Sequence, residues 1–333
     1  MIDKFSLDNK KAKELLPQRP QNANKGTFGR VLIIAGSRKM IGCCELAVSG
    51  AFRCGAGLVT LAFPDCIYDT VTLRLTENTF MPLPSQNGGL SKNCINELIN
   101  EINNFDVIVF GCGLGRSSDI KEVLGELILK SRKPLIIDAD GLNALAENVD
   151  VLKNAECDVL LTPHPGEMSR LIKKDIAFIE KKREKVVMDF SREYNVNVLL
   201  KGHNTIIADN AGSEICINKT GNTGLSKGGS GDLLSGMIAG FTPSLKGDLF
   251  KASCLGAYIH GKASEIVSEE LTEFSTLPTD CSKSIGKVIK TIIESEWLYK
   301  KAFLNIGCAN TFCFYIFLSK HFFWHKQFSR SWF

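Results

Sequence analysis

The stretch Asn222-Thr-Gly-Leu-Ser-Lys-Gly-Gly-Ser-Gly-Asp-Leu-Leu-Ser-Gly-Met-Ile-Ala-Gly240 joins a strand-like segment, residues 213–219, to an apolar segment with helical spacing. Glycine backbone can come close to a ligand, and a following helix adds unpaired N–H groups and the positive end of its dipole. This combination binds anions, phosphate above all. Asp232 lies where the anion would be bound, which suggests that its carboxylate is placed to accept a proton. The simpler alternative is a flexible turn in which Asp232 is only a first-turn helix charge.

Segments with the composition of strands and of helices alternate along the chain around this stretch. Continuous apolar runs such as residues 31–35 are typical of strands buried on both faces of a sheet. The pattern predicts strands at 31–35, 55–63, 107–110, 134–138, 158–162, 196–200 and 206–208, and helices at 41–54, 120–129 and 250–267. Such alternation implies βαβ units, so we expect one α/β domain with a mostly parallel central sheet flanked by helices on both faces.

Unusual residues fall at the ends of these predicted strands. Ligands of parallel sheets bind beyond the carboxyl ends of the strands. At those ends the sequence has Gly36, the glycines of 111–115, Asp138, Asp140, His164, Glu167 and Lys201. The agreement between separate segments favours a binding site over a flexible turn at 222–232.

The overall composition is that of an ordinary globular protein. The chain has 333 residues, and its formal charge of +4 does not favour a nucleic-acid partner. Its twelve cysteines include no CxxC pair and no zinc-ligand spacing, so we interpret them as small core residues in a reducing compartment. The N-terminus has no secretory signal pattern, which predicts a cytoplasmic protein.

The C-terminal segment departs from this composition. Residues 303–333 hold eight of the twenty phenylalanines and no acidic residue. The uncharged run 302–318 is 17 residues long, shorter than the roughly 20 residues that a membrane-spanning helix needs. We therefore expect a catalytic domain at 1–296 and an atypical aromatic tail at 297–333, most simply an incidental extension, with a membrane or oligomer contact as the alternative.

Two common nucleotide-binding signatures are missing. The chain has no GxxxxGK[ST] motif, and Gly111-Cys-Gly-Leu-Gly115 does not match GxGxxG, which argues against a standard dinucleotide-binding dehydrogenase. The remaining glycine loop and Asp232 suit phosphoryl transfer to an alcohol. Asp232 would accept the hydroxyl proton, while the N–H groups of Gly228, Gly229, Ser230 and Gly231 hold the phosphoryl charge. Mg²⁺ would bridge the phosphates, with Glu167 and Asp138 as candidate carboxylates.

The motif Gly228-Gly-Ser-Gly-Asp232 resembles the anion hole of the ribokinase-like superfamily, whose fold is a three-layer α/β/α sandwich. Five further motifs, in the same order, resemble the nucleotide-dependent NAD(P)H-hydrate dehydratases, which form the C-terminal half of the YjeF-type repair proteins. They are Lys25-Gly-Thr-Phe-Gly-Arg-Val-Leu-Ile-Ile-Ala-Gly-Ser37, Gly55-Ala-Gly-Leu-Val-Thr60, Asp138-Ala-Asp-Gly-Leu-Asn143, Thr162-Pro-His-Pro-Gly-Glu167 and Lys201-Gly-His-Asn-Thr205. The resemblance covers about residues 8–295.

The resemblance implies a lyase that restores NADH or NADPH from the S-epimer of its hydrate. The ring hydroxyl is phosphorylated by ADP or ATP, with ADP expected here, and phosphate then leaves. By matching motifs, the hydrate would contact Cys43, Gly113, His164 and Asp232, and the nucleotide would contact Lys201, Gly202, His203, Asn204, Thr205 and Gly231. Mg²⁺ would be held by Glu167 through water.

The resemblance also implies partners and leaves alternatives. We expect a homo-oligomer, a tetramer by analogy, and dependence on a separate epimerase because the epimerase half of two-domain relatives is absent from this sequence. The family often has alanines at positions 43 and 44 and proline at 112, where this chain has cysteines. One alternative is a small-molecule kinase of the same superfamily, acting on a thiazole, pyridoxine or hydroxymethylpyrimidine. The other is a nucleotide sensor without activity.

Overall fold

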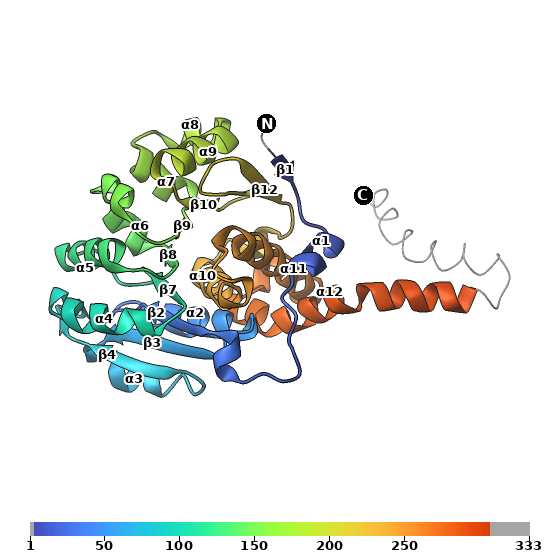
Figure 1. Ribbon diagram of the computed structural model, residues 1–333, viewed down its shortest axis with the longest axis horizontal. Coiled ribbons are helices and arrows are strands. Elements are labelled where there is room, and N and C mark those ends of the chain that lie inside the picture. Colours follow the sequence, from blue (N-terminus) through green and yellow to red (C-terminus); the bar gives the residue numbers. More distant parts are fainter. Residues whose placement is uncertain (1–2, 307–333) are drawn as a thin grey trace, which may run out of the picture. The chain divides into compact units, whose positions relative to one another are not determined.

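The computed structural model describes residues 3–306, with side chains described through Glu294 (Figure 1). The chain divides into two compact units, Met1–Ile289 and Lys290–Phe333. The first unit contains every described strand and every predicted site residue. The strands are β1 (Asp3–Phe5), β2 (Arg30–Ile34), β3 (Leu58–Pro64), β4 (Thr79–Leu83), β5 (Ser85–Gln86), β6 (Gly89–Leu90), β7 (Val107–Phe110), β8 (Leu135–Ile137), β9 (Val159–Leu161), β10 (Asn197–Leu200), β11 (Thr205–Ala208) and β12 (Glu214–Asn218).

The helices lie between and beside these strands and agree with the predicted alternation. The α-helices are α1 (Asn9–Leu15), α2 (Gly42–Arg53), α3 (Tyr68–Thr72), α4 (Ile95–Glu101), α5 (Ser118–Lys130), α6 (Asp140–Leu145), α7 (Pro165–Ile172), α8 (Ile176–Lys181), α9 (Arg183–Tyr194), α10 (Ser230–Phe241), α11 (Leu249–Ser275) and α12 (Pro278–Ile306). All of the predicted strands and helices are present, most of them within two residues of the predicted ends. The helix predicted at 250–267 continues to Ser275, with a break at Thr272 (φ 70°, ψ 160°).

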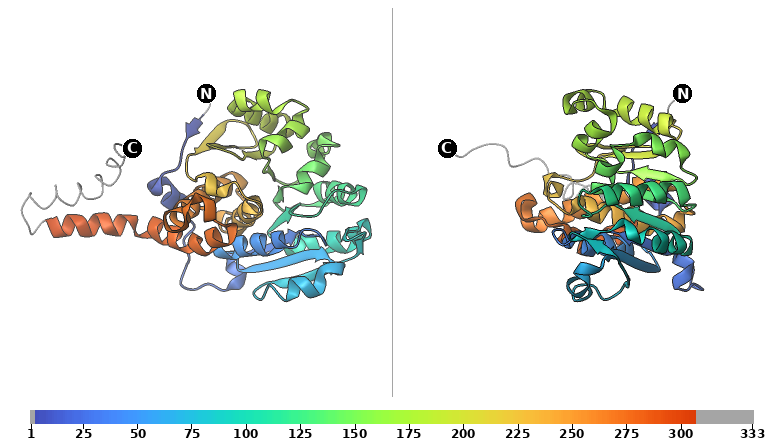
Figure 2. Two further views of the ribbon diagram at one scale, coloured as in Figure 1. Left: turned by 180° about the vertical axis from the view of Figure 1, so that it is seen from behind. Right: turned by 90° about the vertical axis from the view of Figure 1, so that its left-hand side faces the viewer.

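Among the described residues, ten strands form one sheet in the order β1-β12-β11-β10-β9-β8-β7-β2-β3-β4. All neighbouring strands are parallel except β10–β11 and β11–β12, which are antiparallel. The helices α2, α10 and α11 lie on one face of this sheet, and α4 to α9 lie on the other (Figures 1 and 2). The predicted three-layer α/β/α sandwich with a mostly parallel sheet is therefore confirmed.

Continuous apolar runs form the central strands, as the sequence predicted. Every residue of β7 and all but the first of β2 are buried, because helices cover both faces of the sheet there. The edge strand β1 was not predicted. It has three residues, of which two are exposed, and it pairs in parallel with β12. An exposed edge strand of this length lacks the apolar run that makes a central strand recognisable.

The helix that carries Asp232 packs unusually close to a neighbour. A Cβ atom on Gly236 of α10 would lie 2.0 Å from the carbonyl oxygen of Ala47 in α2, and one on Gly240 would lie 2.3 Å from that of Ala51. Only glycine permits this approach. The middle and the C-terminal turn of α10 are thus held against α2.

The order of the strands changes direction between β2 and β7. The chain runs from β2 outward through β3 to β4, then returns to β7 on the other side of β2 and proceeds to β8. The loops that follow β2 and β7 therefore diverge, and a crevice at such a point is the usual ligand site of open α/β sheets. A hydrogen bond from Gly36 N to Cys112 O (2.9 Å) joins the two loops at their start.

The C-terminal helix α12 runs from Pro278 to Ile306 and so passes through position 296, where we expected the domain to end. Most of the aromatic tail, 307–333, lies outside the described residues. Within the described part of the chain, no helix is long and apolar enough to cross a membrane. Eight of the ten described cysteines are buried and all ten are free, consistent with their interpretation as core residues.

Candidate active site

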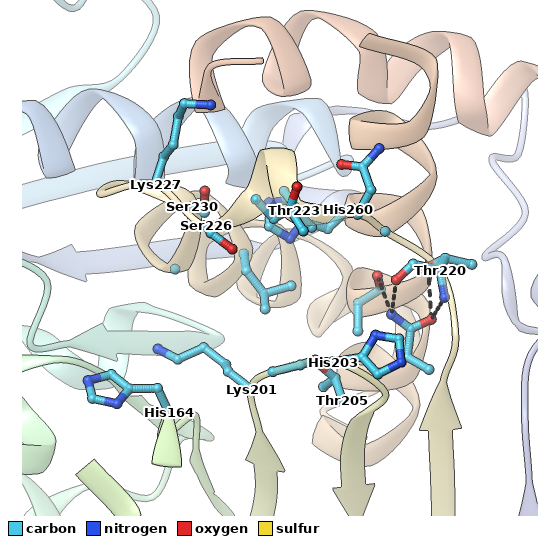
Figure 3. Close-up of a pocket in the computed structure, with 18 of the residues that line it drawn as sticks. His164, Lys201, His203, Thr205, Thr220, Thr223, Ser226, Lys227, Ser230 and His260 are labelled. Atoms are coloured by element: carbon cyan, nitrogen blue, oxygen red, sulfur yellow. Dashed lines mark hydrogen bonds between the residues drawn. The ribbon is translucent and has the colours of Figure 1, made fainter. Parts of the chain in front are cut away.

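A cavity of about 810 Å³ lies at the carboxyl ends of the strands from β8 to β10, within the first unit (Figure 3). One side is formed by the turn that follows β10, with Lys201 and Thr205. The opposite side is the loop between β12 and α10, including Ser226, Lys227 and Ser230. The cavity is where the sequence predicted a ligand, because separate strand ends converge there.

The loop before α10 and the first turn of α10 line this cavity with backbone N–H groups. Gly229 is its N-cap and adopts φ 94°, a left-handed conformation that glycine tolerates without strain. A Cβ atom on Gly228 would meet no atom within 4 Å, so the backbone there is open to a ligand. The first N–H groups of a helix have no partner within the helix. The N–H of Ser230 donates to the carbonyl oxygen of Lys227 at 3.3 Å, so the N–H groups of Gly228, Gly229 and Gly231 are the ones that suit an anion here. The role of the predicted set Gly228, Gly229, Ser230 and Gly231 as an anion site stays a prediction.

Asp232 follows directly in the first turn of α10 and lines the same cavity. Burial raises the pKa of its carboxyl group to about 6, and the nearby charge of Asp138 adds to the rise, while the Cys112 thiol opposes it by hydrogen bonding. A carboxylate with a pKa near neutrality is a better proton acceptor than an ordinary aspartate. The environment of Asp232 thus matches that of a general base.

A buried ion pair lies beside Asp232. Lys201 Nζ donates to Asp138 Oδ1 at 2.7 Å, and Ser235 Oγ donates to Asp138 Oδ2 at 2.7 Å. Asp138 is 1% exposed, yet Lys201 and the Ser235 hydroxyl outweigh burial and lower its carboxyl pKa. Burial alone would lower the pKa of Lys201, but Asp138 and Glu167 raise it. Both groups of the pair are therefore charged at neutral pH.

His164 and Glu167 cap the N-terminus of α7. Glu167 Oε2 accepts from His164 N at 2.8 Å, while His164 Nδ1 accepts from Gly166 N at 2.9 Å. Because Nδ1 is an acceptor, the neutral imidazole carries its proton on Nε2. Burial, together with the charges of Lys201 and Arg170, lowers the pKa of His164 and favours this neutral form. His164 lines the cavity, and its Nε2 lies 3.5 Å from Oε1 of Glu167.

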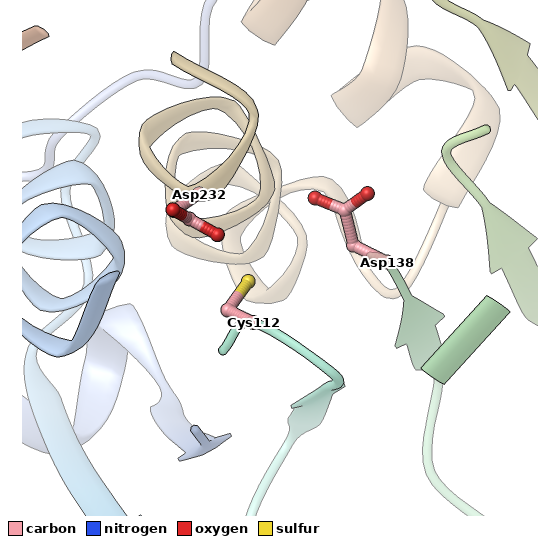
Figure 4. Close-up of side chains that lie close together, drawn as sticks. All are labelled: Cys112, Asp138 and Asp232. Atoms are coloured by element: carbon pink, nitrogen blue, oxygen red, sulfur yellow. The ribbon is translucent and has the colours of Figure 1, made fainter. Parts of the chain in front are cut away.

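The carboxylates of Glu167 and Asp138, the two candidate metal ligands, already form hydrogen bonds within the protein. Burial raises the pKa of Glu167 to about 7, against the opposing charge of Lys201, and its Oε2 is taken up by the α7 cap. Figure 4 shows Cys112, Asp138 and Asp232, whose ligand atoms all lie within 4.8 Å of one another. Mg²⁺ prefers oxygen to sulfur ligands, and it commonly keeps waters and uses one or two carboxylates. The site therefore fits a Mg²⁺ held chiefly by phosphate oxygens and waters.

The segment Lys201–Thr205 is the turn between β10 and β11, and all five of its residues line the cavity. Arg183 of α9 supports this turn. Its Nη2 atom donates to the carbonyl oxygens of Leu200 and Lys201, each at 3.3 Å. The turn that was predicted to contact a nucleotide is thus held against α9 and faces the first turn of α10.

Cys43 and Gly113 lie together on another side of Asp232. The Cys43 thiol donates to the carbonyl oxygens of Met40 and Cys112, and a Cβ atom on Gly113 would lie 2.4 Å from Cys43 Sγ. Neither residue is part of the described cavity wall. The structure therefore brings His164, Asp232 and the Lys201 turn together, while contacts of Cys43 and Gly113 with substrate stay a prediction.

Three features of the site were not predicted. Asp138 was considered only as a candidate metal ligand, and its pairing with Lys201 joins residues 63 positions apart. The cap of α7 has a recognisable signal, since proline at the first helical position and glutamate at the third are typical of helix starts. His260 of α11 also lines the cavity, and its apolar helical surroundings in the sequence carry no such signal.

The fold and the site define a ribokinase-like α/β protein, and a ribokinase-like superfamily protein is among the similar solved structures. More narrowly, the NAD(P)H-hydrate dehydratase family model matches residues 31–287, and this chain belongs to that family. The resemblance seen in the six sequence motifs is therefore confirmed.

Relatives of known name give the same result. The chain is 36% identical over 281 residues to the bifunctional NAD(P)H-hydrate repair enzyme of Moorella thermoacetica, covering 84% of this chain and 52% of that one. It is 33% identical to the ADP-dependent (S)-NAD(P)H-hydrate dehydratase of Neisseria meningitidis, and the match covers 75% of this chain and 81% of that one. The crystal structure of the ADP/ATP-dependent NAD(P)H-hydrate dehydratase of Bacillus subtilis, co-crystallised with ATP and Mg²⁺, matches with a TM-score of 0.73 and 27% identity. This match covers 87% of this chain and 99% of that one. The chain spans about half the length of the bifunctional relatives.

Proposed function

We propose that this chain catalyses the nucleotide-dependent dehydration of the S-epimer of NADH or NADPH hydrate, with ADP as the phosphoryl donor. The observation that supports it most is the position of Asp232, in the first turn of α10 and in one cavity with Lys201 and His164. Membership of the family supports the substrate and favours this lyase over a small-molecule kinase with the same anion site.

In the first step, the ring hydroxyl of the hydrate attacks the terminal phosphorus of the nucleotide. Asp232 accepts the hydroxyl proton, the bond from phosphorus to the bridging oxygen breaks, and the shortened nucleotide leaves. The N–H groups at the start of α10 stabilise the charge on the transferring phosphoryl group. The Lys201 ammonium lies close to Gly231 at the start of α10 and adds a fixed positive charge, held in place by Asp138.

In the second step, the phosphorylated ring loses phosphate. The carbon–oxygen bond breaks with its electron pair on the departing phosphate, and the ring nitrogen donates electrons to the carbon. Loss of a proton from the adjacent ring carbon restores the reduced nicotinamide. His164, whose Nδ1 is engaged by the α7 cap, orients the substrate through Nε2–H.

The proposal uses Mg²⁺ as a cofactor and the nucleotide as a cosubstrate. Mg²⁺, when bound, neutralises charge on the phosphate oxygens, and Glu167 would hold it through water. The turn Lys201–Thr205 would hold the nucleotide together with Gly231, where an added Cβ atom would lie 3.2 Å from Lys201 Nζ. Cys43 and Gly113 would contact the hydrate beyond Asp232.

The proposal is tested by recovery of the reduced nicotinamide. The chain is incubated with Mg²⁺, NADH hydrate and either ADP or ATP, and absorbance of the reduced nicotinamide band is followed. We expect recovery with ADP. Phosphorylation of a thiazole or pyridoxine alcohol, with no recovery of NADH on either nucleotide, would favour the kinase alternative instead.

The rate should depend on pH through Asp232. The base must be unprotonated to accept the hydroxyl proton, and burial raises the pKa of Asp232 to about 6. We therefore expect kcat/KM to be constant above pH 7 and to fall about tenfold per pH unit below 6. A profile that stays flat down to pH 5 would exclude Asp232 as the base.

Residues 1–296 form the proposed catalytic domain, and the aromatic segment 297–333 is not needed for it. A chain that ends at Glu296 is expected to fold and to keep the dehydratase activity of the full chain. Far-UV circular dichroism and the same absorbance assay measure both properties. Failure of the shortened chain to fold would assign the aromatic segment to the core or to a subunit contact.

The proposal includes a cytoplasmic location, a homotetramer and coupling to a separate epimerase that supplies the S-epimer. The epimerase coupling has a direct consequence. In a mixture of the two hydrate epimers, the chain alone should consume only the S-epimer, and added epimerase should carry the reaction to completion.

The proposed homotetramer is tested separately. Size-exclusion chromatography with light scattering measures the oligomeric state.

A further inference from the structure

Two buried side chains that line the cavity have a polar atom without a hydrogen-bond partner among the described residues, Ser230 Oγ at the start of α10 and His260 Nε2. Ser230 belongs to the predicted anion site, whereas His260 has no role in the proposed function. His260 of α11 is 5% exposed, lines the cavity, and its Nε2 atom is buried with no partner among the described residues (Figure 3). Buried polar atoms are nearly always hydrogen-bonded, because an unpaired one loses its bonds to water without replacement. An unpaired imidazole nitrogen in a ligand cavity indicates that a ligand supplies the missing partner.

The imidazole of His260 is suited to an uncharged ligand group. Burial lowers its pKa to about 4, and the charge of Lys201 contributes, so the ring is neutral at physiological pH. A neutral imidazole donates or accepts a single hydrogen bond at Nε2 and supplies no charge to a phosphate. Lys201 and the N–H groups at the start of α10, which lie close together at Gly231, already offer positive charge and donors to the phosphates.

The surroundings of His260 also suit the uncharged part of a nucleotide. Leu225, Leu234 and Ala257 line the cavity together with His260 and give it an apolar wall. Ala257 lies one turn before His260 on α11, and its carbonyl oxygen accepts from Asn218 Nδ2 at 3.1 Å, which fixes α11 beside the end of β12. Apolar walls with a few placed polar atoms are typical of sites for flat organic ligands.

We propose that His260 forms a hydrogen bond through Nε2 to the nucleoside part of the bound nucleotide, and so helps to determine which nucleotide is used. This inference rests on the proposed use of a nucleotide but adds a residue that the sequence motifs do not include. The contacted group is a ribose hydroxyl or a nitrogen or oxygen of the base, each of which bonds a neutral imidazole.

The test compares nucleotide affinity in the full chain and in two variants of His260. His260→Phe keeps an aromatic ring without the hydrogen bond, and His260→Gln keeps a polar group that can restore it in part. Dissociation constants for AMP, ADP and ATP are measured by isothermal titration calorimetry. We expect His260→Phe to weaken all three by about tenfold, the effect of one lost hydrogen bond to a neutral group in a dry site. His260→Gln should lose less.

Two comparisons exclude a merely structural effect. Ser253→Ala removes another buried, unpaired polar atom from α11, outside the cavity, and should leave nucleotide affinity unchanged. The melting temperature of the nucleotide-free His260→Phe variant should equal or exceed that of the unchanged chain, since the phenyl ring leaves no unpaired polar atom. If His260→Phe does not fold, the smaller change His260→Gln decides the question.

The outcomes separate this inference from the proposed function. Nucleotide binding by the unchanged chain with equal affinity in the folded His260 variants would overturn the inference alone. A loss that grows with the number of phosphates would also overturn it, by assigning His260 to the phosphates. No nucleotide binding by the unchanged chain would overturn both proposals. A loss that disappears with 2′,3′-dideoxyadenosine triphosphate assigns the ribose as partner, and one that persists assigns the base.

Discussion

Turnover of NADH hydrate is expected to fall by at least ~10²-fold when Asp232 is replaced with asparagine, the usual scale for loss of a general base. Asparagine has nearly the same shape but cannot accept the proton of the ring hydroxyl. Nucleotide binding should survive, because the N–H groups at the start of α10 and Lys201 remain. The measurement is kcat in the absorbance assay, together with nucleotide affinity by calorimetry.

The stability of this variant provides an independent readout. Burial raises the pKa of Asp232 in the folded chain to about 6, so its ionised form is less favourable in the folded than in the unfolded chain. At pH 7 the carboxylate therefore destabilises the fold, and asparagine should leave the melting temperature unchanged or raise it. Loss of activity without loss of stability is the pattern of a residue retained for chemistry.

Asp119 offers a matched control for Asp232→Asn. It is also an aspartate in the first turn of a helix, α5, but lies outside the cavity. Asp119→Asn should leave kcat unchanged. If Asp232→Asn turns over the hydrate as fast as the original chain, Asp232 is not the base. If the original chain binds nucleotide but does not turn over the hydrate, the sensor alternative is favoured.

The site residues that lie directly after a strand could be predicted from the sequence. Apolar runs located the strands, and the carboxyl ends of parallel strands meet at one edge of the sheet. His164 and Lys201 follow β9 and β10, so both were expected near the ligand, and both line the cavity. The glycines before Asp232 marked the start of α10 in the same way.

Contacts that depend on side-chain packing could not be predicted in this way. The pairing of Lys201 with Asp138 depends on β8 and β10 lying on either side of β9, and on Ser235 of α10 reaching the same carboxylate. Periodicity locates elements but does not specify which polar groups meet between them. His260 is a further example, since only the packing of α11 against the cavity separates it from an ordinary core histidine.

Lys201→Met is expected to lower both the stability of the fold and the rate. Methionine keeps an apolar stem but removes the ammonium that lies 2.7 Å from Asp138 Oδ1. Asp138 is 1% exposed, and a buried charge without its partner destabilises by about 3–5 kcal/mol. Ser235 and the N–H of Ala139 still donate to Asp138, so we expect about 3 kcal/mol, the lower end of that range. Urea denaturation measures the change.

The double variant Asp138→Asn/Lys201→Met separates stability from catalysis. It removes both charges of this ion pair, so it should recover most of the free energy of unfolding that Lys201→Met loses at Asp138. The positive charge of Lys201 beside the start of α10 is still absent. We therefore expect kcat/KM for the nucleotide to stay about 10-fold to 10²-fold below that of the unchanged chain, the effect of one charged hydrogen bond.

Lys153→Met is the matched control for Lys201→Met. Lys153 also pairs with an aspartate, Asp150, at 2.6 Å, but its side chain is 52% exposed. Ion pairs in contact with solvent contribute little to stability, so this variant should resemble the unchanged chain in unfolding and in rate. Full activity in the double variant would exclude Lys201 from phosphoryl transfer. Equal stability of Lys201→Met and the unchanged chain would mean that Asp138 does not need the ammonium, for instance because it takes up a proton when Lys201 is absent.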